Sequence, residues 1–189
     1  MCLISDPHRL IELGWRTFAC RSGQASHRVM SYAFRPAVRA DLPVLSDWLE
    51  TPDVVRWWGD PAEQRALLEE DLGEPGMTML IISFGGSPFA YAQHYAVHRW
   101  PQPHLEHLPA GTRAIDAFVG VPAMLGKGHG SAFLRLLAAE LIAGGAPMVA
   151  IDPDMANARA RAAYARAGFL DDGIVESGEG PVARMLFGG

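Results

Sequence analysis

Two aspartates that interrupt or follow apolar runs are the leading candidates for residues with a chemical role. Asp116 interrupts the run from Ala114 to Val119, and Asp152 follows the run from Met148 to Ile151. A carboxylate in such a run is costly to bury unless a cation or hydrogen-bond donors satisfy it. Two carboxylates near one site would suit binding a cationic amine and removing its proton. The alternatives are that Asp152 caps a helix or meets a structural arginine, and that Asp116 lies at a strand edge.

A glycine-rich segment from Leu125 to Gly130 precedes a helical pattern from Ser131 to Ile142. Its alternating glycines let backbone N–H groups approach a ligand closely, and the helix adds the positive end of its dipole. This combination predicts a phosphate or pyrophosphate site, and a plain turn without a ligand is the alternative. The spacing matches neither a Rossmann fingerprint nor a Walker loop.

Two adjacent tryptophans, Trp57 and Trp58, form a third candidate feature. No single helix or strand face can bury two neighbouring side chains, so one of them is expected to face a cleft. The alternative is that both are packing residues that serve two layers.

The elements that must position these residues can be read from apolar periodicity and turn signals. Asp41 is expected to cap the first helix, which Thr51-Pro52 closes. The segment from Arg99 to Gly111 is rich in proline and cannot be regular; its histidines are interpreted as solvated, because they lack the spacing of metal ligands. The expected strands are 32–35, 77–84, 89–97, 114–119, 148–151, 170–176 and 182–187, and the expected helices begin near residues 42, 61, 131 and 157. The order β-α-α-β-β-β-α-β-α-β-β predicts an α+β mixed sheet.

Length and composition indicate one domain. The chain has 189 residues, of which 49% are hydrophobic, and its formal net charge is −5. This charge gives no reason to expect nucleic acid and favours a cationic small molecule. No apolar run is long enough to cross a bilayer, so we expect a cytoplasmic protein that binds no membrane. We assign the domain to residues 30–189 and treat residues 1–29, which show no clean period, as an N-terminal extension without an assigned role.

The glycine segment together with the helix led by Asn157, which carries Tyr164 and ends at Gly168-Phe169, resembles the GNAT superfamily of acetyl-CoA-dependent N-acyltransferases. The resemblance covers Tyr32 to Phe187. It implies a GNAT-type mixed, mostly antiparallel sheet that is flanked by helices and whose fourth and fifth strands splay apart. It also implies that acetyl-CoA, without a metal, is bound by Leu125, Gly126, Lys127, Gly128, His129, Gly130, Asn157 and Tyr164. Leu125 replaces the usual Gln or Arg, which removes a side-chain donor but leaves the main-chain cradle.

Within the superfamily, the sequence is most similar to aminoglycoside 6'-N-acetyltransferases. The similarity rests on Trp57-Trp58-Gly59, Tyr91-Ala92-Gln93, Ile115-Asp116 and Asp152-Pro153. It implies direct transfer of an acetyl group to an amine of a polycationic aminoglycoside. Asp116 and Asp152 would bind and deprotonate the amine, with Trp57 or Trp58 beside the substrate. Tyr164 would be the proton donor to the departing thiolate, unless it is an ordinary core residue.

Two alternatives to this function stay open at the level of the sequence. The first is an N-acyltransferase that acts on another amine, such as a siderophore precursor. The second is a noncatalytic CoA-binding module, in which the acids serve the structure. A monomer and a homodimer are both compatible with the sequence. Cys2 and Cys20 lie outside every motif, so neither a disulfide nor a cysteine nucleophile is indicated.

Overall fold

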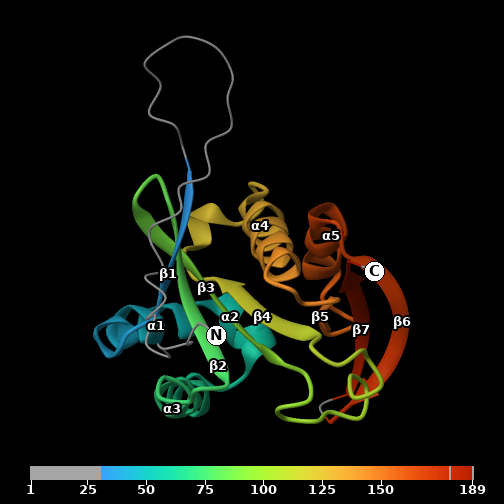
Figure 1. Cartoon of the computed structure of the whole chain (residues 1–189). Coiled ribbons are helices and arrows are strands. Elements are labelled where there is room, and N and C mark those ends of the chain that lie inside the picture. Colours follow the sequence, from blue (N-terminus) through green and yellow to red (C-terminus); the bar gives the residue numbers. More distant parts are fainter. Residues whose placement is uncertain (1–30, 179, 189) are drawn as a thin grey trace, which may run out of the picture.

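A seven-stranded mixed sheet organises the part of the chain that the computed structural model describes, residues 31–178 and 180–188 (Figure 1). The strand order is β1-β2-β3-β4-β5-β7-β6, and every neighbouring pair is antiparallel except β4 and β5. The strands are β1 (Tyr32–Pro36), β2 (Met77–Phe84), β3 (Ser87–Ala96), β4 (Arg113–Val119), β5 (Val149–Ile151), β6 (Leu170–Ser177) and β7 (Gly180–Phe187). The predicted α+β class and mixed sheet are confirmed, while the expected extension 1–29 lies outside the described residues.

The helices include one that the sequence analysis missed. They are α1 (Leu42–Leu49), α2 (Pro52–Trp58), α3 (Pro61–Asp71), α4 (His129–Ala143) and α5 (Ala158–Ala167), with short 3-10 turns at Arg39–Asp41 and Pro122–Met124. The missed helix is α2. Pro52 was expected to end the first helix, but it also opens the next one, because proline is well suited to the first helical position.

The expected capping role of Asp41 is also wrong. Its carboxylate makes no side-chain cap to α1. It instead accepts two hydrogen bonds from the guanidinium of Arg35, at 2.7 and 2.5 Å, and one from the backbone N–H of Val38 at 2.9 Å. Asp41 therefore holds the end of β1 rather than the start of α1.

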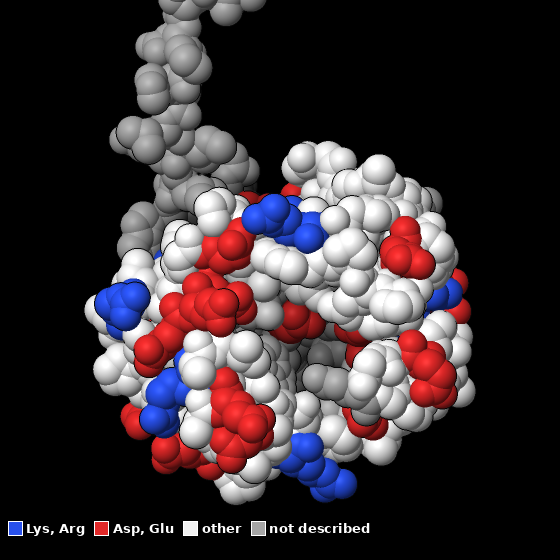
Figure 2. All heavy atoms as spheres, turned by 90° about the horizontal axis from the view of Figure 1, so that it is seen from below, with Lys and Arg blue, Asp and Glu red and all other residues white. Residues whose placement is uncertain are grey.

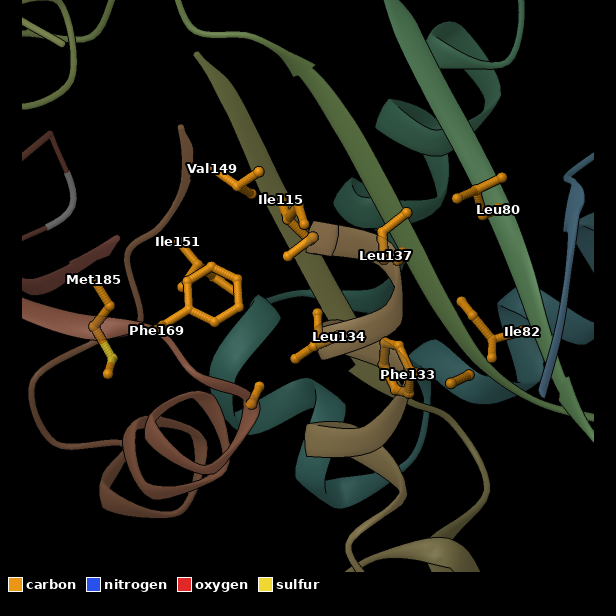
Figure 3. Close-up of a cluster of buried hydrophobic side chains, with 14 of the residues drawn as sticks. Leu80, Ile82, Ile115, Phe133, Leu134, Leu137, Val149, Ile151, Phe169 and Met185 are labelled. Carbon is orange, nitrogen blue, oxygen red and sulfur yellow. The ribbon is translucent and has the colours of Figure 1, made fainter. Parts of the chain in front are cut away.

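Helices cover both faces of the sheet, as the alternation of side chains along β2 requires. Leu80 and Ile82 belong to the core beneath α4 and α5, whereas Met79 and Ile81 belong to the core beneath α1, α2 and α3. Figure 3 shows the first of these cores, in which α4 points its apolar side chains at the sheet. The labelled α4 residues are Phe133, Leu134 and Leu137.

Strands β4 and β5 diverge after a short parallel pairing. They are paired only at Arg113 with Val149 and at Ala114 with Ala150. Beyond those pairs β4 continues toward Val119 paired with β3 but not with β5, and the chain leaves β5 at Ile151. The expected splay of the fourth and fifth strands is therefore present, and it opens a space in the middle of the sheet.

A half-buried histidine, His94, links β3 to β4. Arg113 of β4 donates a hydrogen bond from its guanidinium to Nδ1 of His94 at 2.7 Å. That nitrogen must be unprotonated to accept. Burial, and next the positive charge of Arg113, lower the pKa of His94 from its ordinary 6.5 to about 4.

We predict that His94 makes the fold sensitive to mild acid. Between pH 6.5 and pH 4 the unfolded chain binds a proton at this position that the folded protein does not bind. The free energy of unfolding therefore falls as the pH decreases through this window, by roughly 3 kcal/mol at most. Denaturant unfolding of wild type and His94→Gln at several pH values measures this slope.

The His94→Gln variant should lack this part of the pH dependence, since glutamine does not titrate. His98→Gln, at an exposed position nearby in the sequence, serves as the control and should keep the wild-type slope. Equal slopes for wild type and His94→Gln would contradict the prediction.

Candidate functional site

A cleft of about 950 Å³ lies where β4 and β5 diverge. Figure 2 shows a hollow on the face of the molecule seen from below, with acidic side chains around it. The cleft brings together nearly all of the residues predicted from the sequence: Trp57, Trp58, Asp116, Leu125, Gly126, Gly128, His129, Gly130, Asp152, Asn157 and Tyr164. Among the predicted site residues, Lys127 alone does not line it, and Lys127 is exposed.

The lining of the cleft carries an excess of negative charge. Among the residues that the structure describes, its acidic members are Asp53, Asp71, Asp116, Asp152 and Asp154, and its basic members are Arg159 and Arg166. One of the two arginines is already paired, because Arg159 lies 3.0 Å from Asp53. A concave surface with this balance attracts cations.

Asp116 is held by a chain of side chains on β3. Gln93 lies opposite Asp116 in the β3–β4 register and donates from Nε2 to its Oδ2 at 3.0 Å. The hydroxyl of Tyr91 in turn donates to Oε1 of Gln93 at 2.6 Å. Asp116 also lies beyond the last pair between β4 and β5. It is therefore both at a local strand edge and in the wall of the cleft, as its two sequence interpretations had suggested separately.

Asp152 meets a histidine that the sequence analysis did not identify as a site residue. Nε2 of His104 lies 2.6 Å from Oδ2 of Asp152. The His104 side chain is only 3% exposed, so the interpretation of the histidines in 99–111 as solvated is wrong for this one. The signal that could have found it is the neighbouring Leu105 and Leu108, which are also buried and anchor the segment to the core.

The two tryptophans of α2 both line the cleft, but they differ in their contacts. The Trp58 ring packs edge-on against Phe118 and Tyr91, at centroid distances of 4.8 and 6.1 Å. Trp57 is covered by the guanidinium of Arg56, which lies 4.8 Å from the ring centroid. Trp58 thus joins the wall of the cleft to the core, and Trp57 extends that wall outward.

Tyr164 of α5 is placed to remain a hydroxyl. Burial, and next the nearby charges of Asp116 and Asp152, raise the pKa of Tyr164 well above its ordinary value. The phenol is therefore protonated at neutral pH and can act as a proton donor in the cleft. Its ring also packs near Phe169, so a role in the core and a role in the cleft are compatible.

The glycine segment forms a backbone cradle at the start of α4. Gly126 and Gly128 have φ angles of +71° and +85°, which favour glycine. Apart from chain neighbours and the backbone of the helix itself, no described atom lies within 4 Å of the Cβ positions of Gly126, Gly128 and Gly130. The first turn of α4 leaves N–H groups without acceptors inside the helix. The His129 side chain turns to β1, where its Nδ1 lies 2.7 Å from the Tyr32 hydroxyl. Main-chain donors, an open surface and a helix N-terminus together fit a phosphate group.

Comparison with known proteins agrees with this geometry. Residues 37–177 match the Acetyltransferase (GNAT) domain family. The chain belongs to the GNAT acetyltransferases. Its GNAT relatives include the aminoglycoside N(6')-acetyltransferase type 1 of Klebsiella pneumoniae, which is 31% identical over 169 residues that cover 82% of each chain.

Solved GNAT structures give the same result. The crystal structure of the aminoglycoside acetyltransferase AAC(6')-Ib in complex with coenzyme A and kanamycin has a TM-score of 0.75 and 30% identity, over 84% of this chain and 95% of that chain. An uncharacterized protein from Bacillus halodurans reaches a TM-score of 0.79 at 17% identity, over 91% of this chain and 89% of that chain, which supports the fold alone. The resemblance to GNAT enzymes noted in the sequence is confirmed.

The described part of this GNAT chain carries neither a cluster of metal ligands nor a helix that could span a membrane. Within residues 31–178 and 180–188, no group of three or more histidine, cysteine or acidic side chains could hold a metal ion. None of the helices in the same residues combines the length and apolar character that a membrane span needs.

Asn157 has a clear local role at the start of α5. Its Oδ1 accepts a hydrogen bond from the N–H of Ala160 at 3.0 Å, which caps the helix. Only the Nδ2 group of this side chain is left as a donor to a ligand. The predicted contribution of Asn157 to cofactor binding therefore reduces to the donors of its NH2 group and to the placement of α5.

We predict that Asn157→Ala lowers the free energy of unfolding by about 1 kcal/mol, because it removes the cap of α5. Asn157→Asp should keep most of that stability, since a carboxylate can also cap and interacts favourably with the helix dipole. Denaturant unfolding of the three proteins measures the difference. Equal stability of wild type and Asn157→Ala would argue against the cap.

Proposed function

We propose that residues 30–189 form an acetyl-CoA-dependent N-acetyltransferase whose acceptor is a primary amine of a polycationic small molecule, namely the 6'-amine of an aminoglycoside. The observation that carries this proposal is the cleft itself, in which Asp116 and Asp152 lie in the same cavity as the glycine cradle. The names of the curated relatives and the ligands of the similar solved structures support the same choice of cosubstrate and acceptor.

The cradle accounts for the binding of acetyl-CoA. Main-chain N–H groups of Gly126 to Gly130, at the positive end of the α4 dipole, would hold the pyrophosphate. The Leu125 side chain offers no hydrogen bond, so binding relies on the backbone. Acetyl-CoA supplies a thioester whose carbonyl carbon accepts the amine, and the splay of β4 and β5 gives its arm a place to enter the sheet.

The two aspartates account for the binding of the amine. An aminoglycoside carries several ammonium groups, and charge-assisted hydrogen bonds to Asp116 and Asp152 offset the cost of desolvating the carboxylates. The amine must lose a proton before it can attack, and a carboxylate beside it can accept that proton. Trp57 and Trp58 border the same cavity and offer apolar surface to the sugar rings.

Tyr164 accounts for the departure of the thiol. As the C–N bond forms and the C–S bond breaks, the sulfur must gain a proton, and the protonated phenol of Tyr164 can donate it. Both cysteines, Cys2 and Cys20, lie outside the motifs and outside the described residues. The proposed transfer is direct, from the thioester to the amine, without an acyl-enzyme.

We predict that Gly128→Val weakens acetyl-CoA binding by about 10-fold or more, because a branched side chain would occupy the open surface of the cradle. Isothermal calorimetry measures the affinity. Gly86→Val is a matched control: Gly86 lies in the β2–β3 turn with a φ of +88°, close to the +85° of Gly128, and its Cβ position is equally open.

The two valine variants should share the cost of backbone strain, so their losses of stability should be similar. Only Gly128→Val should lose affinity. If both variants bind acetyl-CoA like wild type while they remain folded, the cradle does not bind the pyrophosphate.

We predict that Asp116→Asn and Asp152→Asn both impair the acetylation of kanamycin, in different kinetic constants. A carboxylate that only binds an ammonium group should, when lost, raise KM by about 10-fold or more. The carboxylate that accepts the proton should, when lost, lower kcat by about 100-fold or more. Steady-state thiol release with kanamycin and acetyl-CoA gives both constants.

Asp154→Asn is the control for these two variants. Asp154 also lines the cleft, but its side chain is engaged by the N–H of Ala156 at 2.6 Å. Its amide variant should keep near wild-type kinetics. Full activity of both Asp116→Asn and Asp152→Asn would contradict the assignment of the site. A wild type that binds acetyl-CoA but acetylates no aminoglycoside would contradict the assignment of the acceptor.

A further inference from the structure

His104 lies outside the set of residues that the proposed reaction uses, yet it makes a short contact to one of them. Its Nε2 is 2.6 Å from Oδ2 of Asp152. The two residues are 48 positions apart in the sequence, so neither helix capping nor a local turn explains the contact. His104 also belongs to the lining of the cleft.

The main chain around His104 is fixed by the far end of the sheet. Arg184 of β7 donates from its guanidinium to the carbonyl oxygen of His104 at 2.9 Å, and the same guanidinium lies 2.6 Å from Asp172 of β6. Leu105 and Leu108 are buried beside Tyr95. The imidazole is therefore set in place by the fold before any substrate binds.

The pattern of hydrogen bonds on the imidazole is unusual for a purely structural histidine. Nδ1 is buried and has no hydrogen-bond partner among the residues that the structure describes. Leaving such an atom unsatisfied costs free energy, and native structures rarely do so without a reason. The side chain is thus committed to a single contact, the one between Nε2 and Asp152.

We propose that His104 is a positioning residue that orients the carboxylate of Asp152 toward the amine of the acceptor. A proton on Nε2 engages Oδ2, and Oδ1 is left as the oxygen that faces an ammonium group. Gln93 contacts Asp116 in a similar way, because its Nε2 donates a hydrogen bond to Oδ2 of that carboxylate. The inference rests on the proposed acetyl transfer, and it adds a specific role for the irregular segment before β4.

The chemistry of the pair explains why orientation matters here. Asp152 follows the last residue of β5, beyond the pairs with β4. The backbone there is still held by β7, through Ile151 with Met185 and through Pro153 with Ala183, but backbone pairing does not fix the rotamer of the Asp152 side chain. A carboxylate free to rotate would lose rotamer entropy on each binding event, and a preset one does not. Preset carboxylates also hold the amine in one geometry relative to the reacting carbon.

The test compares His104→Leu, His104→Gln and His107→Leu in steady-state kinetics with kanamycin and acetyl-CoA. His104→Leu should impair the same constant that Asp152→Asn impairs, by about 10-fold, and should leave the KM for acetyl-CoA unchanged. His104→Gln should recover most of the loss, because its amide N–H can reach the position of Nε2. His107→Leu, at an exposed position in the same segment, should behave like wild type.

A double-mutant cycle separates positioning from a general structural role. In the Asp152→Asn background, adding His104→Leu should change kinetics by less than about 2-fold. Independent, multiplying effects, or a His104→Leu variant that loses affinity for both substrates together with its unfolding midpoint, would overturn the inference. A wild type without turnover would overturn the proposed function and this inference with it, whereas an active wild type with unaffected His104→Leu kinetics would overturn the inference alone.

Discussion

The short parallel pairing of β4 and β5 is the constraint on which the rest of this structure depends. Two residue pairs hold the halves of the sheet together, and the hydrogen-bonding edges of both strands are then released. Buried backbone groups without partners are costly, so an opening of this kind persists only where other groups or a ligand can satisfy them. The opening also lets Asp116, on β4, and Asp152, directly after β5, face one cavity.

Around this opening, the carboxylates of Asp116 and Asp152 are held by side chains that are not permanent cations. Gln93 and His104 each contact one oxygen of a carboxylate, and neither is a permanent cation. An arginine in either place would bind more strongly but would also neutralise the charge that attracts an ammonium group. Elsewhere the fold does use arginine, for instance Arg35 on Asp41, where the carboxylate has only a structural task.

The parts of the fold that the sequence predicts well are those coded by local patterns. The β2–β3 hairpin follows from two β-type runs separated by a turn that contains two glycines, and α4 follows from its apolar period after the glycine segment. The α2 helix could not be recognised because its seven residues are too few to show a helical period. In addition, a proline such as Pro52 can mark either the end or the start of a helix. The contact of His104 with Asp152 could not be read from any local pattern, because it joins an irregular segment to a strand 48 residues away.

The hydrogen bond between Tyr32 and His129 ties the glycine segment to the first strand of the sheet. Among the described strands, β1 lies at one end of the order and pairs with β2 alone, so it opens more readily than the strands within the sheet. The His129 ring also packs on Phe84 of β2, with centroids 4.5 Å apart, next to the place where Tyr32 pairs with that residue. Order in the loop and closure of the sheet margin are therefore thermodynamically linked. Binding of the proposed acetyl-CoA at the glycine segment would therefore stabilise β1, although β1 does not line the cleft.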